Sequence, residues 1–507
     1  MQTLKNTVIQ QLIAAGINNP VVTACIHDSY GDYQCESMIN EPRDQIIAFA
    51  EKHGFEVAGR GYLNSRISVN DITSFLNLMA STSKLGVEPV FANKNLVIDF
   101  SSPNIAKPLH AGHIRSTFIG DSLARIAKEV GYNVHCVNHL GDCGAQFGKL
   151  LLGLEKTDLS LLSLESMADA YKSVTAQIAA ENLTGENYTN IAARNTLTKL
   201  HHGDPVLTNL WQQCQNISLS NLKSVYSDLG IHFDEFKGES TYLPFLPALV
   251  KELEENGLVT ISNGAKIVEI NNLPPCLIQK QDGAFLYATT DLAALKHRID
   301  NGADEIWYVV GEPQTLHLKQ IFAVSAVSNI AKHIDFGSIL GTDGKIMKSR
   351  SGDNVLLQDI LDQAIAEALL IINSKSSSGK MSGNKDFVAK QIGYGAIKFF
   401  ELSQNRSSNY KFDLKIALSL KSGSPYIQNA CCRIQSILNG KAVFSDILPE
   451  ETPEFKKLSL LLARFPEVIE DVTQDHRIHF LPEYLKKTAA AFHAFYHLHT
   501  ISGKFNS

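Results

Sequence analysis

The strongest constraint on the fold is a strand–helix–strand pattern between residues 95 and 140. NLVIDF at 95–100 is a short apolar run typical of a buried strand, and YNVHCVNHL at 132–140 predicts a second strand. The residues between them, at 111–130, have the apolar spacing of an amphipathic helix. Two strands joined by a crossover helix form a right-handed unit of parallel sheet. We therefore expect an α/β fold, and alternating strand and helix patterns at 283–341 extend it.

The chain of 507 residues is long enough for about three domains. Residues 1–85 predict a small α+β domain, and 86–375 predict a doubly wound, Rossmann-type domain with a helical insertion at 151–245. A run rich in Ser, Gly and Lys at 374–386 predicts a flexible boundary. Residues 386–507 show only helical periodicity and are expected to form an all-α domain.

The composition is that of an ordinary globular protein, with 44% hydrophobic and 19% charged residues. No apolar run approaches the roughly 18 residues that span a membrane, and the first residues lack the features of a signal or transit peptide. The eight cysteines include no C-x-x-C pair, so we expect reduced thiols, a cytoplasmic location and no structural metal. The net charge of −6 neither suggests nor forbids RNA binding, which would need local basic patches.

Two histidines, His110 and His113, surround Gly112 where the first strand gives way to the helix. Zinc proteases place histidines four apart with a glutamate between them, so this spacing does not favour a metal site. An anion site fits better, because Pro108 suits a first helical turn and helix N-termini offer unpaired amides. Ligands also bind at the carboxyl ends of parallel strands. On this pattern alone, two surface histidines on a capped helix stay an alternative.

The sequence around these histidines resembles the class I aminoacyl-tRNA synthetases, and specifically the arginyl-tRNA synthetase family. The similar stretches include SSPNIAKPLHAGHIRST, NHLGDCGAQFG, VYSDLGIHFDEFKGES, DGAFLYATTDLAA, GAIKFFELSQNRSSNYKFD and SPYIQNACCR, and they cover nearly the whole chain. The resemblance implies an enzyme that activates L-arginine with ATP, as its Mg²⁺ complex, and transfers it to the 3′ end of tRNA(Arg). It further implies that activation requires tRNA and that the protein is a monomer.

Arginine activation places developing charge on phosphate oxygens, which fixed hydrogen-bond donors stabilise. His110 and His113 suit this role, and Gly112 leaves room for adenine, as the resemblance also implies. The family's second signature, K-M-S-K-S, corresponds to IMKSR at 346–350, which lacks both signature lysines. We expect the pyrophosphate to be held instead by Lys107, Lys348 and Arg350, although solvated charges on a turn are the alternative. The resemblance adds two residues to the ATP site, Met347 and His317, although His317 is nearly as well explained as a core histidine.

Selection of arginine requires carboxylates that match its planar fork of N–H donors. Tyr287 and Asp291 are four apart and share a face if their segment is helical. Asp99, at the end of the first strand, points into the same crevice if its neighbours face the core. By resemblance, these three hold the guanidinium, while Asn104 and Gln314 hold the α-amino and carboxylate end. A helix-surface ion pair is the alternative for Asp291, and proline stands where the family often has Asp before Gln314.

The RNA contacts are less distinct in the sequence. Tyr426 and Gln428, together with Arg433 and Arg406, combine an aromatic ring with cations, as in proteins that bind unstacked RNA bases. By resemblance, residues 386–507 bind the anticodon and 1–85 contact the tRNA elbow. A helix-packing aromatic residue would give the same pattern. The elbow contacts expected in the first domain are Asn64 and Arg66.

Two other functions compete with this interpretation. A small-molecule nucleotidyltransferase shares H-x-G-H and the fold but needs no helical C-terminal domain. A non-catalytic RNA-binding relative would not need His110, His113, Asp142 and Asp291 together. GAQFGKL at 144–150 is not a P-loop, because only three residues separate its glycines. The family normally continues past AFHAFYHLH, so the last domain is expected to be shortened or the chain truncated.

Overall fold

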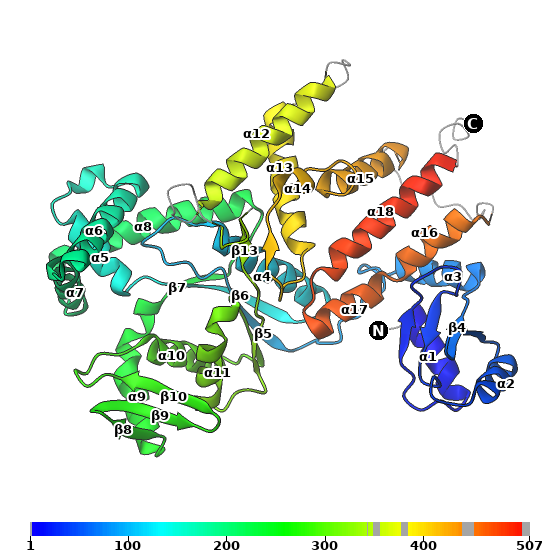
Figure 1. The fold of residues 1–507 in the computed structure, drawn as a ribbon, viewed down its shortest axis with the longest axis horizontal. Helices are drawn as coiled ribbons and strands as arrows, with labels where there is room; N and C mark the ends of the chain where they lie inside the picture. Colours follow the sequence, from blue (N-terminus) through cyan, green and yellow to red (C-terminus); the bar gives the residue numbers. More distant parts are fainter. Residues whose placement is uncertain (1–2, 342, 348–354, 377–383, 439–450, 499–507) are drawn as a thin grey trace. The chain divides into compact units, whose positions relative to one another are not determined.

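The computed structural model describes residues 3–341, 343–347, 355–376, 384–438 and 451–498 (Figure 1). The chain divides into two compact units. The first, here the sheet unit, contains residues 93–128 and 132–418. The second, here the terminal unit, contains 1–92, 129–131 and 419–507, and so joins the two ends of the chain.

The sheet unit is built on five parallel strands in the order β12-β11-β5-β6-β7. Its strands are β5 (Asn95–Phe100), β6 (Asn133–Leu140), β7 (Glu235–Gly238), β11 (Glu305–Val309) and β12 (Ala331–His333). The first of these in the chain, β5, lies in the middle, and later strands are added on both sides of it. The direction of winding therefore changes next to β5, which is where open α/β sheets bind ligands. The α/β fold with a doubly wound parallel sheet is confirmed.

Helices surround this sheet, and the unit also contains a three-stranded and a two-stranded sheet. The helices of the unit are α4 (Ala111–Glu129), α5 (Ala145–Leu154), η1 (Leu159–Leu161), α6 (Leu164–Thr184), α7 (Tyr188–His201), α8 (Pro205–Asp228), η2 (Glu239–Phe245), α9 (Leu246–Glu255), α10 (Tyr287–Asp300), η3 (Glu312–Gln314), α11 (Thr315–Val324), α12 (Leu357–Ser376), α13 (Lys385–Leu402) and α14 (Leu414–Ala417). The remaining strands are β8 (Val259–Ser262), β9 (Ala265–Ile270), β10 (Leu273–Gln279), β13 (Ile339–Leu340) and β14 (Tyr410–Lys411). Strands β8, β9 and β10 form an antiparallel sheet of their own.

Two segments differ from the sequence expectation. The insertion predicted as helical at 151–245 also contains β7, the edge strand that pairs with β6. The helical domain was expected to start at 386, but α13 and α14 lie in the sheet unit, which runs to residue 418. The physical reason is shared packing, because Ala389 and Ala396 of α13 share a buried cluster with Ala368 of α12.

The terminal unit combines a small sheet with helices from the other end of the chain. Its elements are α1 (Leu4–Ala14), β1 (Val22–Ala24), β2 (Tyr33–Cys35), α2 (Arg43–His53), β3 (Glu56–Ala58), β4 (Tyr62–Ser65), α3 (Val69–Ala80), α15 (Ser424–Leu438), α16 (Pro453–Ala463), α17 (Phe465–Asp475) and α18 (Phe480–Leu498). The strand order is β1-β2-β4-β3, with antiparallel pairing. Leu460 and Ala463 of α16 belong to the core of this domain, and the hydroxyl of Tyr33 donates to Glu467 at 2.7 Å. The first domain and α16–α17 thus share one core.

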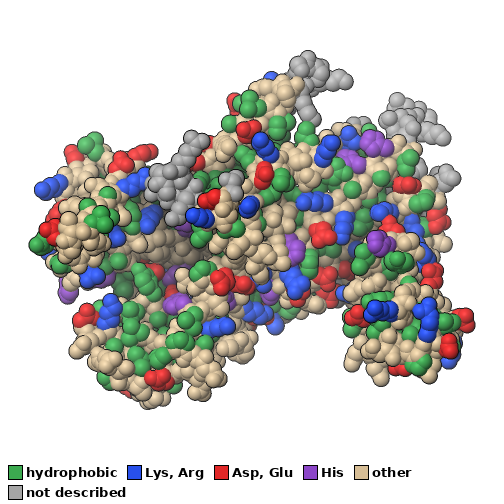
Figure 2. Space-filling view, in the orientation of Figure 1, with side chains coloured by type: hydrophobic (Ala, Val, Ile, Leu, Met, Phe, Trp, Pro, Cys, Tyr) green, Lys and Arg blue, Asp and Glu red, His purple; other side chains and the backbone are tan. Residues whose placement is uncertain are grey.

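The surface carries charges of both signs. On the face drawn in Figure 2, lysine and arginine side chains are interspersed with aspartate and glutamate. Within the described ranges, no helix is both long and apolar enough to cross a membrane.

Candidate active site

The segment after β5 is held in an unusual backbone conformation. Ser101 and Ser102 have positive φ angles of 69° and 42°, which side-chain-bearing residues adopt only when their surroundings enforce it. The N–H of Ser101 donates to Ser116 Oγ at 2.7 Å, and the hydroxyl of Ser102 donates to Asp99 at 2.7 Å. These bonds turn the chain from the end of β5 toward the start of α4, and so fix where His110 lies.

The two histidines at the start of α4 hold each other in a defined state. The Nδ1 atom of His113 accepts from the N–H of His110 at 3.1 Å, and Nδ1 of His110 accepts from the N–H of Gly112 at 3.1 Å. Since Nδ1 accepts in both rings, the neutral rings carry their proton on Nε2. Burial lowers the pKa of His113 to about 3, and burial with nearby Lys107 lowers the pKa of His110. Both are therefore neutral donors at neutral pH.

A cavity of about 220 Å³ adjoins this pair, here the histidine cavity. Its lining includes His110, Gly112, Phe336 and Met347. A Cβ at Gly112 would lie only 2.8 Å from the ring of His110, so glycine is required there. The predicted ATP residues Gly112 and Met347 thus lie around one cavity together with His110.

One wall of the histidine cavity is fixed by a buried ion pair. Arg115 and Glu401 are each 1% exposed, with Nε and the carboxylate 2.8 Å apart. Arg115 also donates to the carbonyls of Gly337 and Ser408 at 2.9 and 2.8 Å. Arg115 could not be selected from the sequence, because its partners lie far along the chain.

Of the three cations predicted to hold pyrophosphate, Lys107 lies within the described residues. Lys107 is exposed, and its ammonium lies 4.5 Å from the centre of the Tyr171 ring on α6. This cation–π contact holds the lysine just before the histidine pair. Lys348 and Arg350 lie outside the described residues.

Asp291 faces two imidazoles in this structure. Nε2 of His317 donates to its carboxylate at 2.6 Å, and Nε2 of His139 lies 3.7 Å away. Both ring nitrogens of His139 are buried and have no hydrogen-bond partner among the described residues. Tyr287, at the start of the same helix, is 57% exposed. His317, predicted to contact nucleotide, lies in this structure against the predicted arginine acid.

Glu239, which the sequence analysis missed, stands close to Asp291. It is the first residue of η2, directly after the carboxyl end of β7. Burial, followed by the negative charges of Asp291 and Asp142, raises its pKa to about 8. We call Asp142, Glu239 and Asp291 the acid cluster. Glu239 could have been found in the sequence as an acid that directly follows a parallel strand. This required β7 to be recognised as a strand.

Asp142, itself a member of the acid cluster, holds the turn that carries Glu239. Its carboxylate accepts from the N–H of Ser240 at 2.8 Å, the hydroxyl of Ser240 at 2.6 Å and the side-chain amide of Gln215 at 2.8 Å. Burial nevertheless raises its pKa. A Cβ at Gly238 would lie 1.9 Å from Asp142, so glycine is needed before Glu239. Asp142 therefore shapes the site through the chain that it holds.

The carboxylate of Asp99 already has hydrogen-bonding partners and does not belong to the acid cluster. Its carboxylate is 6% exposed and lies 2.6 Å from Nη2 of Arg298, while its other oxygen accepts from Ser102. The prediction that Asp99 binds arginine required its neighbours to face the core, so that Asp99 itself would point into the crevice. Ile98, Asp99 and Phe100 are all buried, because β5 is the central strand and is covered on both faces.

The residues predicted for the α-amino and carboxylate end lie at the ends of two neighbouring strands. Asn104 forms a bridge with Gly141, just after β6, and its side-chain oxygen accepts from the N–H of Ala106 at 3.1 Å. Gln314 is exposed at the end of η3, which follows β11. Both therefore lie at the carboxyl edge of the sheet, as does the histidine pair.

The predicted anticodon residues do not all lie together. Tyr426 and Arg433 are on α15 and both contact His493 of α18, with ring centroids 4.8 Å apart for Tyr426 and a 3.4 Å contact for Arg433. Gln428, on the same helix, is half-buried. Arg406 belongs instead to the sheet unit, where it pairs with Asp335 at 2.7 Å.

The residues predicted to contact the tRNA elbow form hydrogen bonds within their own domain. Asn64 is 2% exposed on β4, and its amide donates to the carbonyl of Tyr30 at 2.8 Å. Arg66 is exposed but pairs with Glu56 at 2.9 Å and donates to the carbonyl of Ser29 at 2.7 Å. Asn64 is placed as a buried structural residue, whereas Arg66 keeps an accessible guanidinium.

Comparisons with known proteins agree with this arrangement. A family model described as "tRNA synthetases class I (R), catalytic domain" matches residues 75–414, and a "DALR anticodon binding domain" model matches 427–506. An arginine–tRNA ligase of Laribacter hongkongensis is 32% identical over 98% of this chain and 92% of its own length. One from a Cyanothece species is 34% identical over 94% of this chain and 88% of its own.

Solved structures share the fold. The arginyl-tRNA synthetase of Plasmodium falciparum has a TM-score of 0.81 at 24% identity and covers 98% of this chain and 93% of its own. That of Thermus thermophilus has a TM-score of 0.78 at 21% identity, with coverage of 97% and 91%. Because the catalytic family model spans more than half of the sequence and curated relatives exceed 30% identity over nearly all of it, the chain belongs to the arginyl-tRNA synthetase family of class I.

Proposed function

We propose that this chain activates L-arginine with ATP and transfers it to tRNA(Arg), as a cytoplasmic monomer. In the first step an arginine carboxylate oxygen bonds to the α-phosphorus of ATP, and the bond to the leaving pyrophosphate breaks. In the second, a terminal ribose hydroxyl of the tRNA attacks the arginyl carbonyl and AMP leaves. The observation that carries the proposal is a pair of neutral donors, His110 and His113, at the same sheet edge as the acid cluster.

The histidine pair acts on the phosphate side. Both rings carry their proton on Nε2, so each can donate to an α-phosphate oxygen as charge develops there. Donors fixed before the reaction need no reorganisation during it. ATP binds as its Mg²⁺ complex, with adenine in the histidine cavity against Gly112 and Met347. Lys107, Lys348 and Arg350 hold the departing pyrophosphate.

The acid cluster acts on the arginine side. Asp291 and Glu239 accept hydrogen bonds from the guanidinium. Tyr287, the first residue of α10, covers it. The arriving cation replaces His317 as the donor to Asp291. It also lowers the pKa of Glu239, so that Glu239 releases its proton to the solvent, because a positive charge favours the ionised carboxyl. Asn104 and Gln314 orient the α-amino and carboxylate end. Asp99 supports this site from behind through Ser102 rather than by direct contact.

The terminal unit binds transfer RNA. In the terminal unit, α15 presents Gln428 beside Tyr426 and Arg433 to the anticodon, and Arg66 is the elbow contact that the structure leaves accessible. We propose that arginine activation requires this tRNA to be bound.

The test is exchange of radiolabelled pyrophosphate into ATP, with arginine present and tRNA(Arg) either present or omitted. We expect exchange with tRNA and none above background without it, at tRNA concentrations high enough to saturate the enzyme. Exchange that is equally fast without tRNA would contradict the proposed order and favour a nucleotidyltransferase. A tRNA whose terminal ribose lacks both hydroxyls is the control, because it can bind but cannot accept arginine.

A further inference from the structure

One cation of the proposed phosphate side contacts the helical insertion. Lys107 lies on the turn between β5 and α4, three residues before His110, and its side chain is exposed. Burial, and after it the charge of Lys107, lowers the pKa of His110, which places that charge near the ring. The ammonium also lies 4.5 Å from the centre of the Tyr171 ring on α6. This contact therefore joins the insertion to the histidine pair.

The ring of Tyr171 is held in place by α5. Its hydroxyl donates to the side-chain oxygen of Gln146, in the first turn of α5. A Cβ at Gly153 would lie 2.8 Å from the carbonyl oxygen of Ala170, so α5 and α6 are in close contact next to Tyr171. Tyr171 is also one turn from the buried Met167, so it lies on the packed face of α6. The aromatic face is thus presented from two closely packed helices.

Lys107 keeps its charge available for an anion. Within the described ranges, its ammonium forms no ion pair with a carboxylate. An aromatic ring attracts an ammonium through its negative face but does not neutralise it. A carboxylate in the place of the ring would offset the charge that has to attract pyrophosphate.

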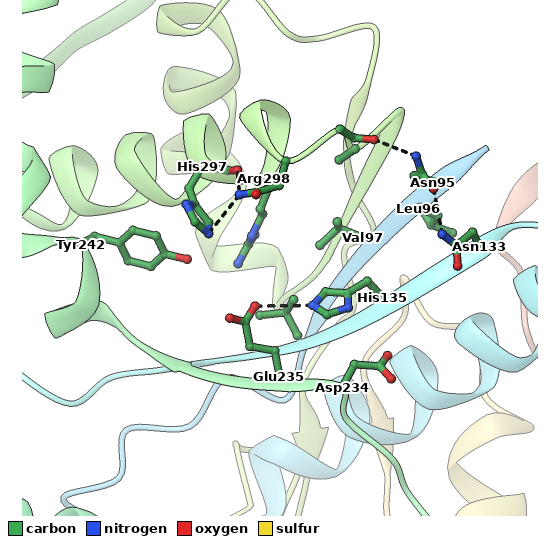
Figure 3. Close-up of a pocket in the computed structure, with 14 residues that line it drawn as sticks. Asn95, Leu96, Val97, Asn133, His135, Asp234, Glu235, Tyr242, His297 and Arg298 are labelled. Atoms are coloured by element: carbon green, nitrogen blue, oxygen red, sulfur yellow. Dashed lines mark hydrogen bonds and ion pairs between the residues drawn. The ribbon is translucent and has the colours of Figure 1, made fainter. Parts of the chain in front are cut away.

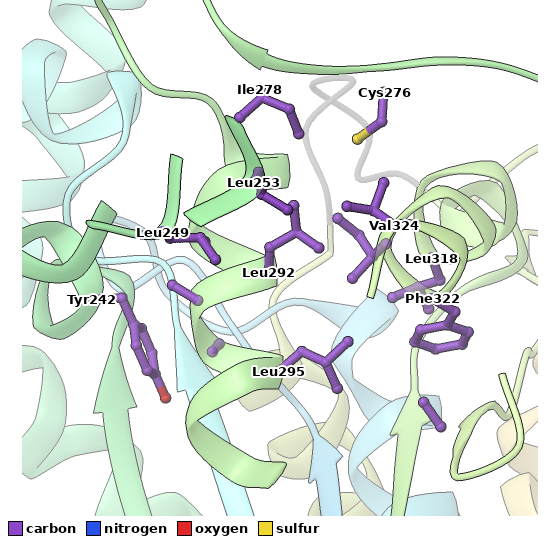
Figure 4. Packing of buried hydrophobic residues seen from close by; sticks show 14 of the residues in the cluster. Tyr242, Leu249, Leu253, Cys276, Ile278, Leu292, Leu295, Leu318, Phe322 and Val324 are labelled. Carbon is purple, nitrogen blue, oxygen red and sulfur yellow. The ribbon is translucent and has the colours of Figure 1, made fainter. Parts of the chain in front are cut away.

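A second lysine–tyrosine contact in the sheet unit differs in this respect. The ammonium of Lys237 lies 5.6 Å from the centre of the Tyr242 ring, but it also pairs with Glu235 at 3.1 Å. Tyr242 is 2% exposed and belongs to a buried hydrophobic cluster (Figure 4). Glu235 and Tyr242 line a cavity of about 510 Å³ at the amino ends of β5 and β6, away from the histidine pair (Figure 3). The charge of Lys237 is already offset, whereas that of Lys107 is not.

A lysine that is held before its ligand arrives binds that ligand at a lower entropic cost. The flexible four-carbon stem of lysine loses rotamer freedom when its ammonium is fixed on a ligand. An aromatic face that restricts the stem beforehand reduces this cost. The ammonium carries three N–H donors, so it can contact the ring and phosphate oxygens together.

On the basis of the proposed role of Lys107, we propose that Tyr171 is a positioning residue for pyrophosphate. Its ring holds the ammonium of Lys107 beside the histidine pair and leaves the charge available to the departing group. The helical insertion thereby takes part in the activation step, through a side chain that does not itself contact the substrate.

The test is pyrophosphate exchange at saturating tRNA(Arg), with kcat/KM for pyrophosphate and KM for arginine measured in each variant. Tyr171→Leu removes the aromatic face and should lower kcat/KM for pyrophosphate about two- to fivefold, the range for a cation–π contact at an exposed site, with KM for arginine unchanged. Tyr171→Phe keeps the face and should stay near the wild-type value. Tyr188→Leu, at an exposed tyrosine that begins α7, is the control and should have no effect. An unchanged kcat/KM in Tyr171→Leu, or an equal loss in Tyr171→Phe, would overturn the proposal.

A double-mutant cycle with Lys107→Met shows whether the ring acts through the lysine. Once Lys107 is replaced, Tyr171→Leu should cause no further loss, and an equal loss in both backgrounds would overturn the proposal. If Lys107→Met itself leaves kcat/KM for pyrophosphate unchanged, the proposed role of Lys107 fails and the role of Tyr171 fails with it. A loss in Lys107→Met without one in Tyr171→Leu would refute the positioning role alone.

Discussion

The two sides of the proposed active site, for phosphate and for arginine, are prepared to different degrees. On the phosphate side, main-chain N–H groups fix the tautomers of His110 and His113, and both rings are neutral donors. On the arginine side, His317 occupies Asp291 and a pKa of about 8 keeps Glu239 protonated at neutral pH. The difference follows from charge. Burying neutral donors without their anion costs little free energy, whereas burying clustered ionised carboxylates without a cation costs much more.

The largest expected effect sharpens this comparison on the arginine side. Lysine cannot present a planar fork, so it would leave Asp291 and Glu239 incompletely paired, and we expect discrimination against it on the order of 10⁴ or more in kcat/KM. Canavanine keeps the guanidino fork and should be rejected only about 10–200-fold. Aminoacylation assays with the three amino acids measure both ratios. Comparable charging of lysine, or equally strong exclusion of canavanine, would contradict recognition by the two acids.

A smaller effect is expected on the phosphate side. His113→Ala or His110→Ala should lower kcat about 10²- to 10³-fold, the usual result of losing one fixed donor. His202→Ala, at an exposed histidine directly after α7, is the control and should leave kcat unchanged. Since the pKa of His113 is about 3, its protonation should not produce a loss of activity between pH 5 and 7. An unchanged kcat in both histidine variants would refute the proposed role of the pair.

Much of the fold and of the phosphate side could be predicted from the sequence, because both depend on local patterns. The apolar run of β5, the helical spacing of α4 and the placement of His110, Gly112 and His113 are all set within one continuous segment, residues 95–129. β7 was hidden because a four-residue edge strand with half-buried residues has no clear alternation. The boundary near 386 was misplaced because the contacts of α13 with α12 are tertiary.

The arginine side was only partly predictable, because its chemistry depends on distant contacts. Tyr287 and Asp291 could be found from their helical spacing. The pairing of Asp99 could not be predicted, because its partner, Arg298, is 199 residues away. Glu239 was missed because its raised pKa comes from burial and from two acids on other elements.

The central claim is that the arginine side stays uncharged at Glu239 until the substrate arrives, and proton release on arginine binding tests it most directly. The pKa of Glu239 is raised from 4.5 to about 8, so below pH 8 the free enzyme holds a proton there that the guanidinium should expel. Calorimetric titrations with arginine, in buffers of different ionisation enthalpy, count that proton. We expect release of close to one proton at pH 7, falling toward none above pH 9, and none in Glu239→Gln at any pH. Arginine binding without proton release at pH 7, or equal release by Glu239→Gln, would contradict the claim.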